Sequence, residues 1–210
     1  DAIGPLSIVA SYSGADGFAA SSSASHDVTL LPPMLPELIS RGDGPGTGKA
    51  IPSQLSNDSL RQIDHQGELI VFMSDWQLLP NDTNGFQDIY LKTRATGQLE
   101  LISVTPDGRS GNFLSDSPSI SSDGRYVVFD SFADDLVEND ENGETDVFVR
   151  DRQLNTTELV SRRYDGMQID GDSYLPQISD DGRYVLFQTM ADGVVADDDN
   201  AARDLYLVDR

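Results

Sequence analysis

The residues best placed for chemistry are carboxylates and amides in three acidic turns. The turns span Asp82–Asp88, Asp140–Asp146 and Asp198–Asp204, and each has an oxygen-bearing side chain at its first, third and seventh positions. Side chains at alternate positions of a tight loop converge. Ca²⁺ takes about six to eight hard oxygen ligands in irregular geometry, whereas Mg²⁺ demands a stricter octahedron. The predicted Ca²⁺ ligands are Asp82, Asn84, Asp88, Asp140, Asn142, Asp146, Asp198, Asn200 and Asp204.

A second interpretation of these turns involves no metal. Asp and Asn side chains commonly bond to their own backbone in Asx-turns and solvated bends, and a single Asp-x-Asn turn favours that interpretation. Three copies of the same turn, each ending in Asp just before an apolar run, favour the cation. Both interpretations stay open at the level of the sequence.

The spacing of the turns points to a repeat architecture. Their first residues are Asp82, Asp140 and Asp198, which gives the same 58-residue period twice. Each turn runs directly into a β-branched and aromatic segment, such as Val147-Phe148-Val149 after the second turn. Self-similarity at a fixed period of this size is typical of solenoids and propellers.

Each repeat contains four short segments that alternate with turns. In the repeat that holds the second turn, they lie near 118–121, 126–129, 147–150 and 157–161. Asp123-Gly124 separates the first two, and Asp-Gly is a strong hairpin signal because glycine readily adopts positive φ. No apolar pattern holds a helical period for ten residues. The sequence therefore predicts an all-β fold, a β-propeller of about 58-residue, four-stranded antiparallel blades; a β-sandwich would not explain the strict period.

The period divides the chain into about four blades within one domain, 1–210. The predicted blades are 1–45, which is degenerate, 54–107, 116–165, and 173–210, which is incomplete. In the degenerate blade Ser21-Ser22-Ser23 stands about where the acidic turn should be, and Glu37-Leu38-Ile39-Ser40-Arg41 matches Glu158–Arg162. Between Arg210 and Asp1 one fourth strand and one first strand are missing. An unusually small ring, a combination of copies and a piece of a longer propeller remain open.

Composition narrows the possible partners. The 210 residues carry a formal charge of −22, which argues against nucleic acid and against an anionic membrane surface. No apolar run is long enough to span a bilayer, so no membrane insertion is expected. Cysteine is absent, so disulfides and thiolate metal sites do not contribute. The absence of cysteine fits many secreted bacterial proteins and leaves the cytosol open. Divalent cations are the natural partner for such an acidic surface, although solubility alone would explain much of the charge.

Catalysis finds little support in the sequence. The two histidines, His26 and His65, lie in different repeats, and no Gly-x-Ser-x-Gly motif is present. Carboxylates are plentiful, but they recur at repeated turn positions, whereas a glycosidase pair should be unique. The chain also contains N-glycosylation triplets, which begin at Asn57, Asn81 and Asn155.

Residues 117–161 and 175–210 resemble the propeller repeats of TolB-like bacterial proteins. They are most similar to the acidic subgroup found in large secreted and cell-surface proteins. The resemblance is strong over 116–210, clear over 54–107 and weak over 1–53. It implies a propeller fold and one Ca²⁺ site in each blade that keeps the acidic turn. It implies no activity, because propellers carry many unrelated ones.

These observations predict a non-catalytic, Ca²⁺-stabilised propeller at the cell surface or outside the cell. Its role would be structural or binding, and its incomplete end blades suggest head-to-tail polymerisation in which copies share a strand or a blade. Proteins and glycans are further possible partners. Two alternatives are a glycan-processing enzyme with its site at the channel end and a TolB-like protein-interaction module in the periplasm.

Overall fold

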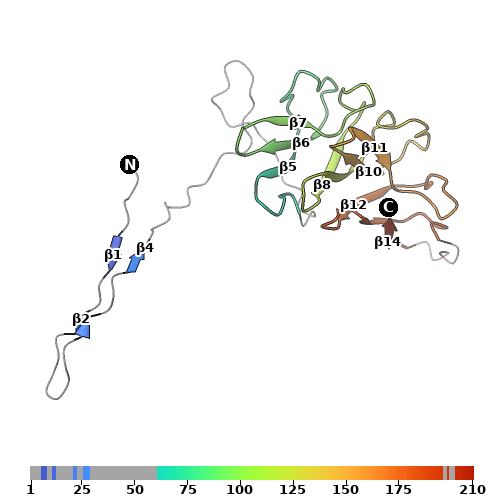
Figure 1. Ribbon diagram of the computed structural model, residues 1–210. Coiled ribbons are helices and arrows are strands. Elements are labelled where there is room, and N and C mark those ends of the chain that lie inside the picture. The colour runs from blue at the N-terminus through green and yellow to red at the C-terminus, as the bar shows by residue number, and fades with distance from the viewer. Residues whose placement is uncertain are drawn as a thin grey trace. The chain divides into compact units, whose positions relative to one another are not determined.

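The computed structural model describes residues 61–195, 198 and 202–210, and the backbone of four short strands between residues 6 and 28 (Figure 1). The chain divides into two compact units, Asp1–Glu37 and Leu38–Arg210. All the regular structure described is β-strand, as the sequence predicts. No helix long and apolar enough to cross a membrane occurs in these residues.

The first unit contains two nested antiparallel pairs. Strand β1 (Leu6–Ile8) pairs with β4 (His26–Val28), and β2 (Ser11–Tyr12) pairs with β3 (Ser21–Ser22). The rest of the predicted degenerate blade, 1–45, lies outside the described residues and stays a prediction.

The second unit contains three successive antiparallel sheets, which we call the second, third and fourth blades. Strands that follow one another in the chain are neighbours in each sheet. The second blade has β5 (Leu69–Ser74), β6 (Asp88–Thr93) and β7 (Leu99–Leu101). The third has β8 (Ser115–Ile120), β9 (Tyr126–Ser131), β10 (Asp146–Asp151) and β11 (Thr156–Leu159). The fourth has β12 (Ser173–Ile178), β13 (Tyr184–Thr189) and β14 (Asp204–Asp209).

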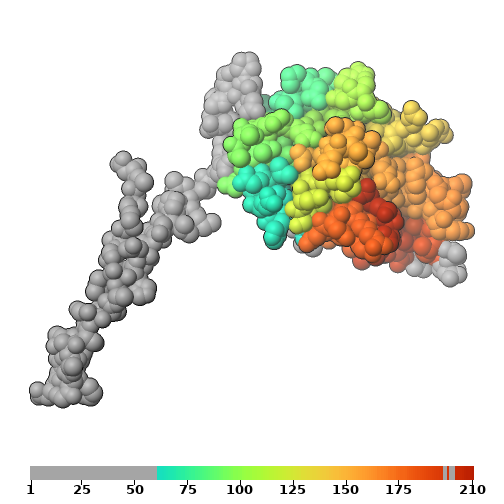
Figure 2. Space-filling model, in the orientation of Figure 1, coloured from blue at the N-terminus to red at the C-terminus, as the bar shows by residue number. Residues whose placement is uncertain are grey.

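The inner position of the second blade is filled by the segment before β5. Ile63 forms an antiparallel bridge with Ile70, and the Val71 amide donates to the Gln62 carbonyl at 2.9 Å. The sheets pack one on the next, as propeller blades do, and Figure 2 shows them in sequence from cyan through yellow to red. The predicted fold of stacked four-stranded blades is confirmed.

Each blade carries one cross-strand aromatic pair with ring centroids 5.9 Å apart. The pairs are Phe72–Tyr90, Phe129–Phe148 and Phe187–Tyr206. The aromatic pair of the third blade packs against Val71 and Ile89 of the second blade. In the same way, Phe187 of the fourth blade packs against Val128 and Val147 of the third. One face of the third blade and of the fourth is therefore aromatic and meets the aliphatic face of the blade before it.

The hairpin between the first two strands of a blade touches the preceding blade. Gly182 has φ +72°, and a Cβ there would lie 2.1 Å from Cδ2 of Tyr126 in the third blade. Gly143 in an acidic turn has a similar φ of +69°, but a Cβ there would meet nothing within 4 Å. The period thus places glycine at Gly182 for two reasons, backbone conformation and close packing between blades.

We expect Gly182→Ala to destabilise the protein more than Gly143→Ala. Both substitutions cost about 1–2 kcal/mol for the left-handed backbone, but only Gly182→Ala also drives a methyl group into the Tyr126 ring. Urea unfolding of the two variants and the parent measures the difference. Equal losses of free energy of unfolding would show that the hairpin does not pack tightly on the preceding blade.

Candidate functional site

The first predicted ligand set, Asp82, Asn84 and Asp88, comes together in a hydrogen-bonded turn. The side-chain amide of Asn84 donates to Asp88 Oδ2 at 2.8 Å, while its oxygen accepts the Phe86 amide at 2.8 Å. Asp88 is fully buried, and its Oδ1 accepts the Ser103 hydroxyl at 2.6 Å. The turn is therefore an Asx-turn whose last carboxylate is tied to the end of the fourth segment of the blade.

The second set, Asp140, Asn142 and Asp146, repeats this arrangement. Asn142 donates to Asp146 Oδ2 at 2.9 Å and accepts the Glu144 amide at 3.0 Å. The Ser161 hydroxyl donates to Asp146 Oδ1 and accepts the Val147 amide at 3.0 Å.

The serines that close these two turns were not predicted. Ser103 and Ser161 stand 58 residues apart at the ends of the fourth segments, so the period itself carried the signal. In both blades the serine oxygen also accepts the amide of the residue after the buried aspartate, from Ile89 and from Val147. One hydroxyl thus joins the start of the third strand to the end of the fourth.

The first aspartate of each turn is satisfied in two different ways. Tyr90 donates its hydroxyl to Asp82 in the second blade, and Tyr206 does the same for Asp198 in the fourth. The third blade has Phe148 at this place, which has no hydroxyl. There the side-chain amide of Gln168 donates to Asp140 Oδ1 at 2.6 Å and to Asp146 Oδ2 at 2.8 Å. A neutral amide therefore lies between the two carboxylates of the third blade.

Burial sets the protonation of these carboxylates. It raises the pKa of Asp88 to about 7, and the nearby charge of Asp82 adds to the rise. Burial also raises the pKa of Asp146 to about 6, against hydrogen bonds from Ser161 and Gln168 that lower it. In the apolar interior the charged form of a carboxyl group is disfavoured unless it is compensated.

The turns differ in how well they fit a cation. In the third blade the Gln168 amide occupies the space between Asp140 and Asp146, so the turn as it stands does not fit Ca²⁺. In the second blade the residue equivalent to Gln168 is Ser110, whose hydroxyl accepts the Thr83 amide at 2.9 Å. That turn leaves Asp82 and Asp88 as neighbouring carboxylates and fits Ca²⁺ better. Asn200 of the last turn lies outside the described residues, and Asp198 and Asp204 are half-buried.

Across the described part of the chain, no three histidine or carboxylate side chains form a group that could hold a metal ion. A cation in the second blade would therefore take at most two carboxylates, from Asp82 and Asp88, and would need carbonyl and water oxygens to complete its shell.

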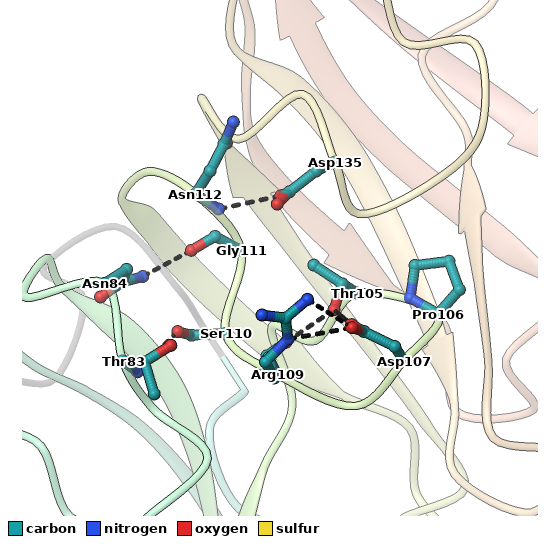
Figure 3. A pocket seen from close by; sticks show the side chains of 10 residues that line it. All are labelled: Thr83, Asn84, Thr105, Pro106, Asp107, Arg109, Ser110, Gly111, Asn112 and Asp135. Carbon is teal, nitrogen blue, oxygen red and sulfur yellow. Dashed lines mark hydrogen bonds and ion pairs between the residues drawn. The ribbon is translucent and has the colours of Figure 1, made fainter.

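A polar cavity of about 550 Å³ opens beside the Asp82–Asp88 turn of the second blade, where Ser110 replaces a longer side chain (Figure 3). Asn84 closes one side by donating to the Gly111 carbonyl at 2.8 Å, and Asp135 closes another by accepting the Asn112 amide at 2.8 Å. The cavity lies between the loops of the second and third blades and presents amides, carboxylates and a guanidinium to solvent. Its lining residues are Thr83, Asn84, Thr105, Pro106, Asp107, Arg109, Ser110, Gly111, Asn112 and Asp135.

One buried carboxylate, Asp130, departs from the repeat and was not predicted. It lies on β9 with 4% of its surface exposed, and its counterparts in the neighbouring blades are Met73 and Gln188. Its Oδ2 accepts the Leu175 amide at 2.9 Å, where β12 bulges with a φ of +54°. Burial raises the pKa of Asp130 to about 7, and the charge of Asp116 adds to the rise. Asp130 thus joins the third blade to the inner strand of the fourth.

Comparison with known proteins gives similarities of fold. No protein-family model and no curated relative matches the sequence. TolB from Acinetobacter baumannii is 16% identical with a TM-score of 0.42, and the match covers 70% of this chain and 28% of that one. A putative TolB from Agrobacterium tumefaciens is 18% identical with a TM-score of 0.46, over 76% of this chain and 46% of that one.

A further match is the β-propeller domain of the Trilobed protease from Pyrococcus furiosus. It is 12% identical with a TM-score of 0.36, over 75% of this chain and 43% of that one. The chain thus spans less than half the length of each of these proteins. The three sheets themselves show the stacked antiparallel blades that the repeats predict.

We expect Gln168→Glu to make the turn of the third blade dependent on a cation. The variant replaces a donor amide by a third carboxylate next to Asp140 and Asp146, which should cost about 1–3 kcal/mol of stability in a chelator. Added Ca²⁺ should recover most of that loss. Urea unfolding with and without Ca²⁺ measures both effects. Gln153→Glu, on an exposed turn, is the matched control, and a Gln168 variant as stable as the parent in chelator would contradict the bridging role.

Asp130 should make stability fall as the pH rises from about 4 to 7. The unfolded carboxyl group loses its proton near its ordinary pKa of 3.8, whereas the folded one keeps it to about 7. The folded state therefore binds more protons in this window, and the free energy of unfolding drops by at most about 1.4 kcal/mol per pH unit. Asp130→Asn, which retains the acceptor for Leu175, should flatten the profile from urea melts. An unchanged slope would contradict the assignment.

Proposed function

We propose that the chain is a non-catalytic β-propeller segment that serves as a structural and binding module outside the cytoplasm, with Ca²⁺ stabilising the acidic turns of its second and fourth blades. The observation that carries this proposal is that the periodic carboxylates form the same structural hydrogen bonds in successive blades. Asp88 and Asp146 accept the hydroxyls of Ser103 and Ser161 and so hold the strands of their blades together. A network repeated from blade to blade supports a scaffold, whereas a catalytic pair would have to be unique.

The carboxylate outside the repeat also supports a scaffold rather than an enzyme. Asp130 is almost completely buried and bonds a backbone amide of the next blade, so a substrate would not reach it. The alternative of a glycan-processing enzyme requires turnover that depends on such a carboxylate. Release of reducing ends from a panel of polysaccharides tests it, with the parent, Asp130→Asn and Asp116→Asn. Turnover that disappears in either variant would overturn the non-catalytic proposal.

The binding role is supported by an exposed aromatic cluster, Phe86, Phe113 and Phe132. The rings of Phe86 and Phe113 stack at 4.4 Å, and those of Phe113 and Phe132 lie 5.0 Å apart. Phe86 and Phe132 are each 39% exposed. Aromatic residues are enriched in protein interfaces, so this cluster also favours the second candidate function, a TolB-like protein-interaction module in the periplasm. Proteins and glycans are the partner classes that suit this cluster and the polar cavity.

The Ca²⁺ role is supported by the charge of the chain and by the acidic turn of the second blade. With a net charge of −22, the folded chain gathers carboxylates that repel one another, and a divalent cation offsets that repulsion. Asp82 and Asp88 are the carboxylates that would hold the ion in the second blade, and Asp198 and Asp204 those in the fourth. In the third blade Gln168 supplies part of the same compensation.

Ca²⁺ should raise the thermal midpoint of the parent, and a chelator should lower it. Binding to the folded state alone stabilises by about 2.7 kcal/mol when free Ca²⁺ is a hundred times the dissociation constant. The shift should become smaller in Asp82→Asn with Asp88→Asn, which leaves only the fourth-blade carboxylates, and persist in full in the matched double variant Asp140→Asn with Asp146→Asn. A melting curve that chelator leaves unchanged would sink the Ca²⁺ proposal.

A further inference from the structure

As far as the structure is described, the last strand of the fourth blade has a free edge. In the third blade, β10 pairs with β9 on one side and with β11 on the other, and in the second blade β6 lies between β5 and β7. In the described part of the chain, β14 pairs with β13 only. A strand edge with open amides and carbonyls is a template for another strand.

A groove of about 450 Å³ follows this edge. Leu159 of β11 lies in the core between the second and third blades, in one hydrophobic cluster with four residues that have counterparts in the next repeat. These residues are Ile102, Phe129, Leu136 and Phe148. Their counterparts in the next pair of blades all line the groove; they are Val160, Phe187, Val194 and Tyr206. The groove is therefore the place that the outer strand of a complete fourth blade would fill.

The outer face of the same sheet is also open. Leu205 and Leu207 are 69% and 66% exposed in the whole chain, whereas their counterparts Val147 and Val149 are 0% and 1% exposed. In the third blade those two valines are covered by the fourth blade. Among the described residues none covers Leu205 and Leu207, so this face of the sheet is open to a neighbour.

The sequence contains one further copy of the outer-strand pattern. The outer segments of the second and third blades end in Glu100-Leu101-Ile102-Ser103 and Glu158-Leu159-Val160-Ser161. Glu37-Leu38-Ile39-Ser40 is identical to the first of these, and Arg41 follows it as Arg162 follows the second. Residues 37–41 lie outside the described part of the chain.

We propose that the free edge and groove of β14 take residues 37–41 of a second copy, so that copies join head to tail by strand addition. This inference rests on the structural role proposed above, and it identifies the partner as a second copy of the chain. Leu38 would fill the groove as Leu159 fills its own site. Ser40 would come to Asp204 as Ser103 comes to Asp88 and Ser161 to Asp146.

The register of the third blade fixes the pairing. Leu159 faces Phe148 and Glu158 faces Val149, so Leu38 would face Tyr206 and Glu37 would face Leu207. The Val160 amide donates to the Val147 carbonyl at 2.8 Å. In an antiparallel ladder alternate amides point to the partner strand. The amides of residues 158 and 160 therefore point to β10, and the amide of residue 157 does not.

Two consequences follow from this register. Pro36 corresponds to Thr157, so its missing amide would cost no ladder bond. On β14 the amide of Leu207, like that of Val149, points to the added strand and not to β13. A proline at position 207 would therefore block strand addition without breaking the bonds between β13 and β14.

Sedimentation of the full chain over a range of concentrations tests the proposal. The parent should reach a weight-average mass at least twice the 22.8 kDa of one chain. Leu207→Pro should stay monomeric, while Leu207→Thr, which keeps the edge amide, should still associate. A synthetic peptide of residues 35–43 should bind the parent and reduce its mass, and a scrambled peptide should not.

A parent that is monomeric at all concentrations and binds no peptide would overturn the proposal. That result would indicate that residues 37–41 of the same chain fill the groove. Equal masses for the parent and Leu207→Pro would overturn it as well. Both results are distinguishable from failure of the Ca²⁺ role. Oligomers whose melting curve does not respond to a chelator would overturn only the Ca²⁺ proposal. A monomer whose melting curve does respond would overturn only the strand-addition proposal.

Discussion

The structure depends on a buried carboxylate at the start of each third strand. Asp88 and Asp146 have no exposed surface, and an ion in that position is unstable without hydrogen-bond donors. Ser103 and Ser161 supply a donor from the end of the outer segment, and the same oxygens accept the next strand amide. The outer segment must therefore end where the acidic turn ends. This coupling fixes the register of the outer strand and explains why turn and strand recur together at a period of 58 residues.

A second constraint comes from the other aspartate of each turn, and the blades solve it differently. Tyr90 and Tyr206 reach this carboxylate from the aromatic pair of their blade, so one ring serves both the core and the turn. Phe148 keeps the packing but loses the hydroxyl, and Gln168 from the following loop replaces it. The amide also reaches Asp146, which reduces the repulsion that would otherwise call for a cation. Tyrosine and glutamine are thus alternative means of holding an acidic turn, and only the tyrosine leaves its two carboxylates without a bridging donor.

The repeat made most of the fold predictable, because strands, Asp-Gly hairpins and acidic turns are local patterns that recur. The Asx-turn geometry of the candidate site follows from the same local chemistry. What could not be predicted depends on contacts between blades. Gln168 reaches the turn from a loop more than twenty residues away, and the Asp130–Leu175 bond spans 45 positions and requires a bulge in β12. No local pattern encodes either contact, since each exists only once neighbouring sheets have stacked.

The charge of the chain bears on how copies would meet. At a net charge of −22, two copies repel one another over most of their surfaces, so a stable contact needs a region where that repulsion is reduced. The groove beside β14 is such a region. Arg162, Arg163 and Arg210 line it together with apolar side chains, so three of the fourteen basic residues gather at the free edge. Arg210 already pairs with Glu158 there, as Arg152 pairs with Glu100 one blade earlier. The three arginines outnumber the two carboxylates of the groove, Glu158 and Asp209, so this end of the array reduces the repulsion that another copy would meet.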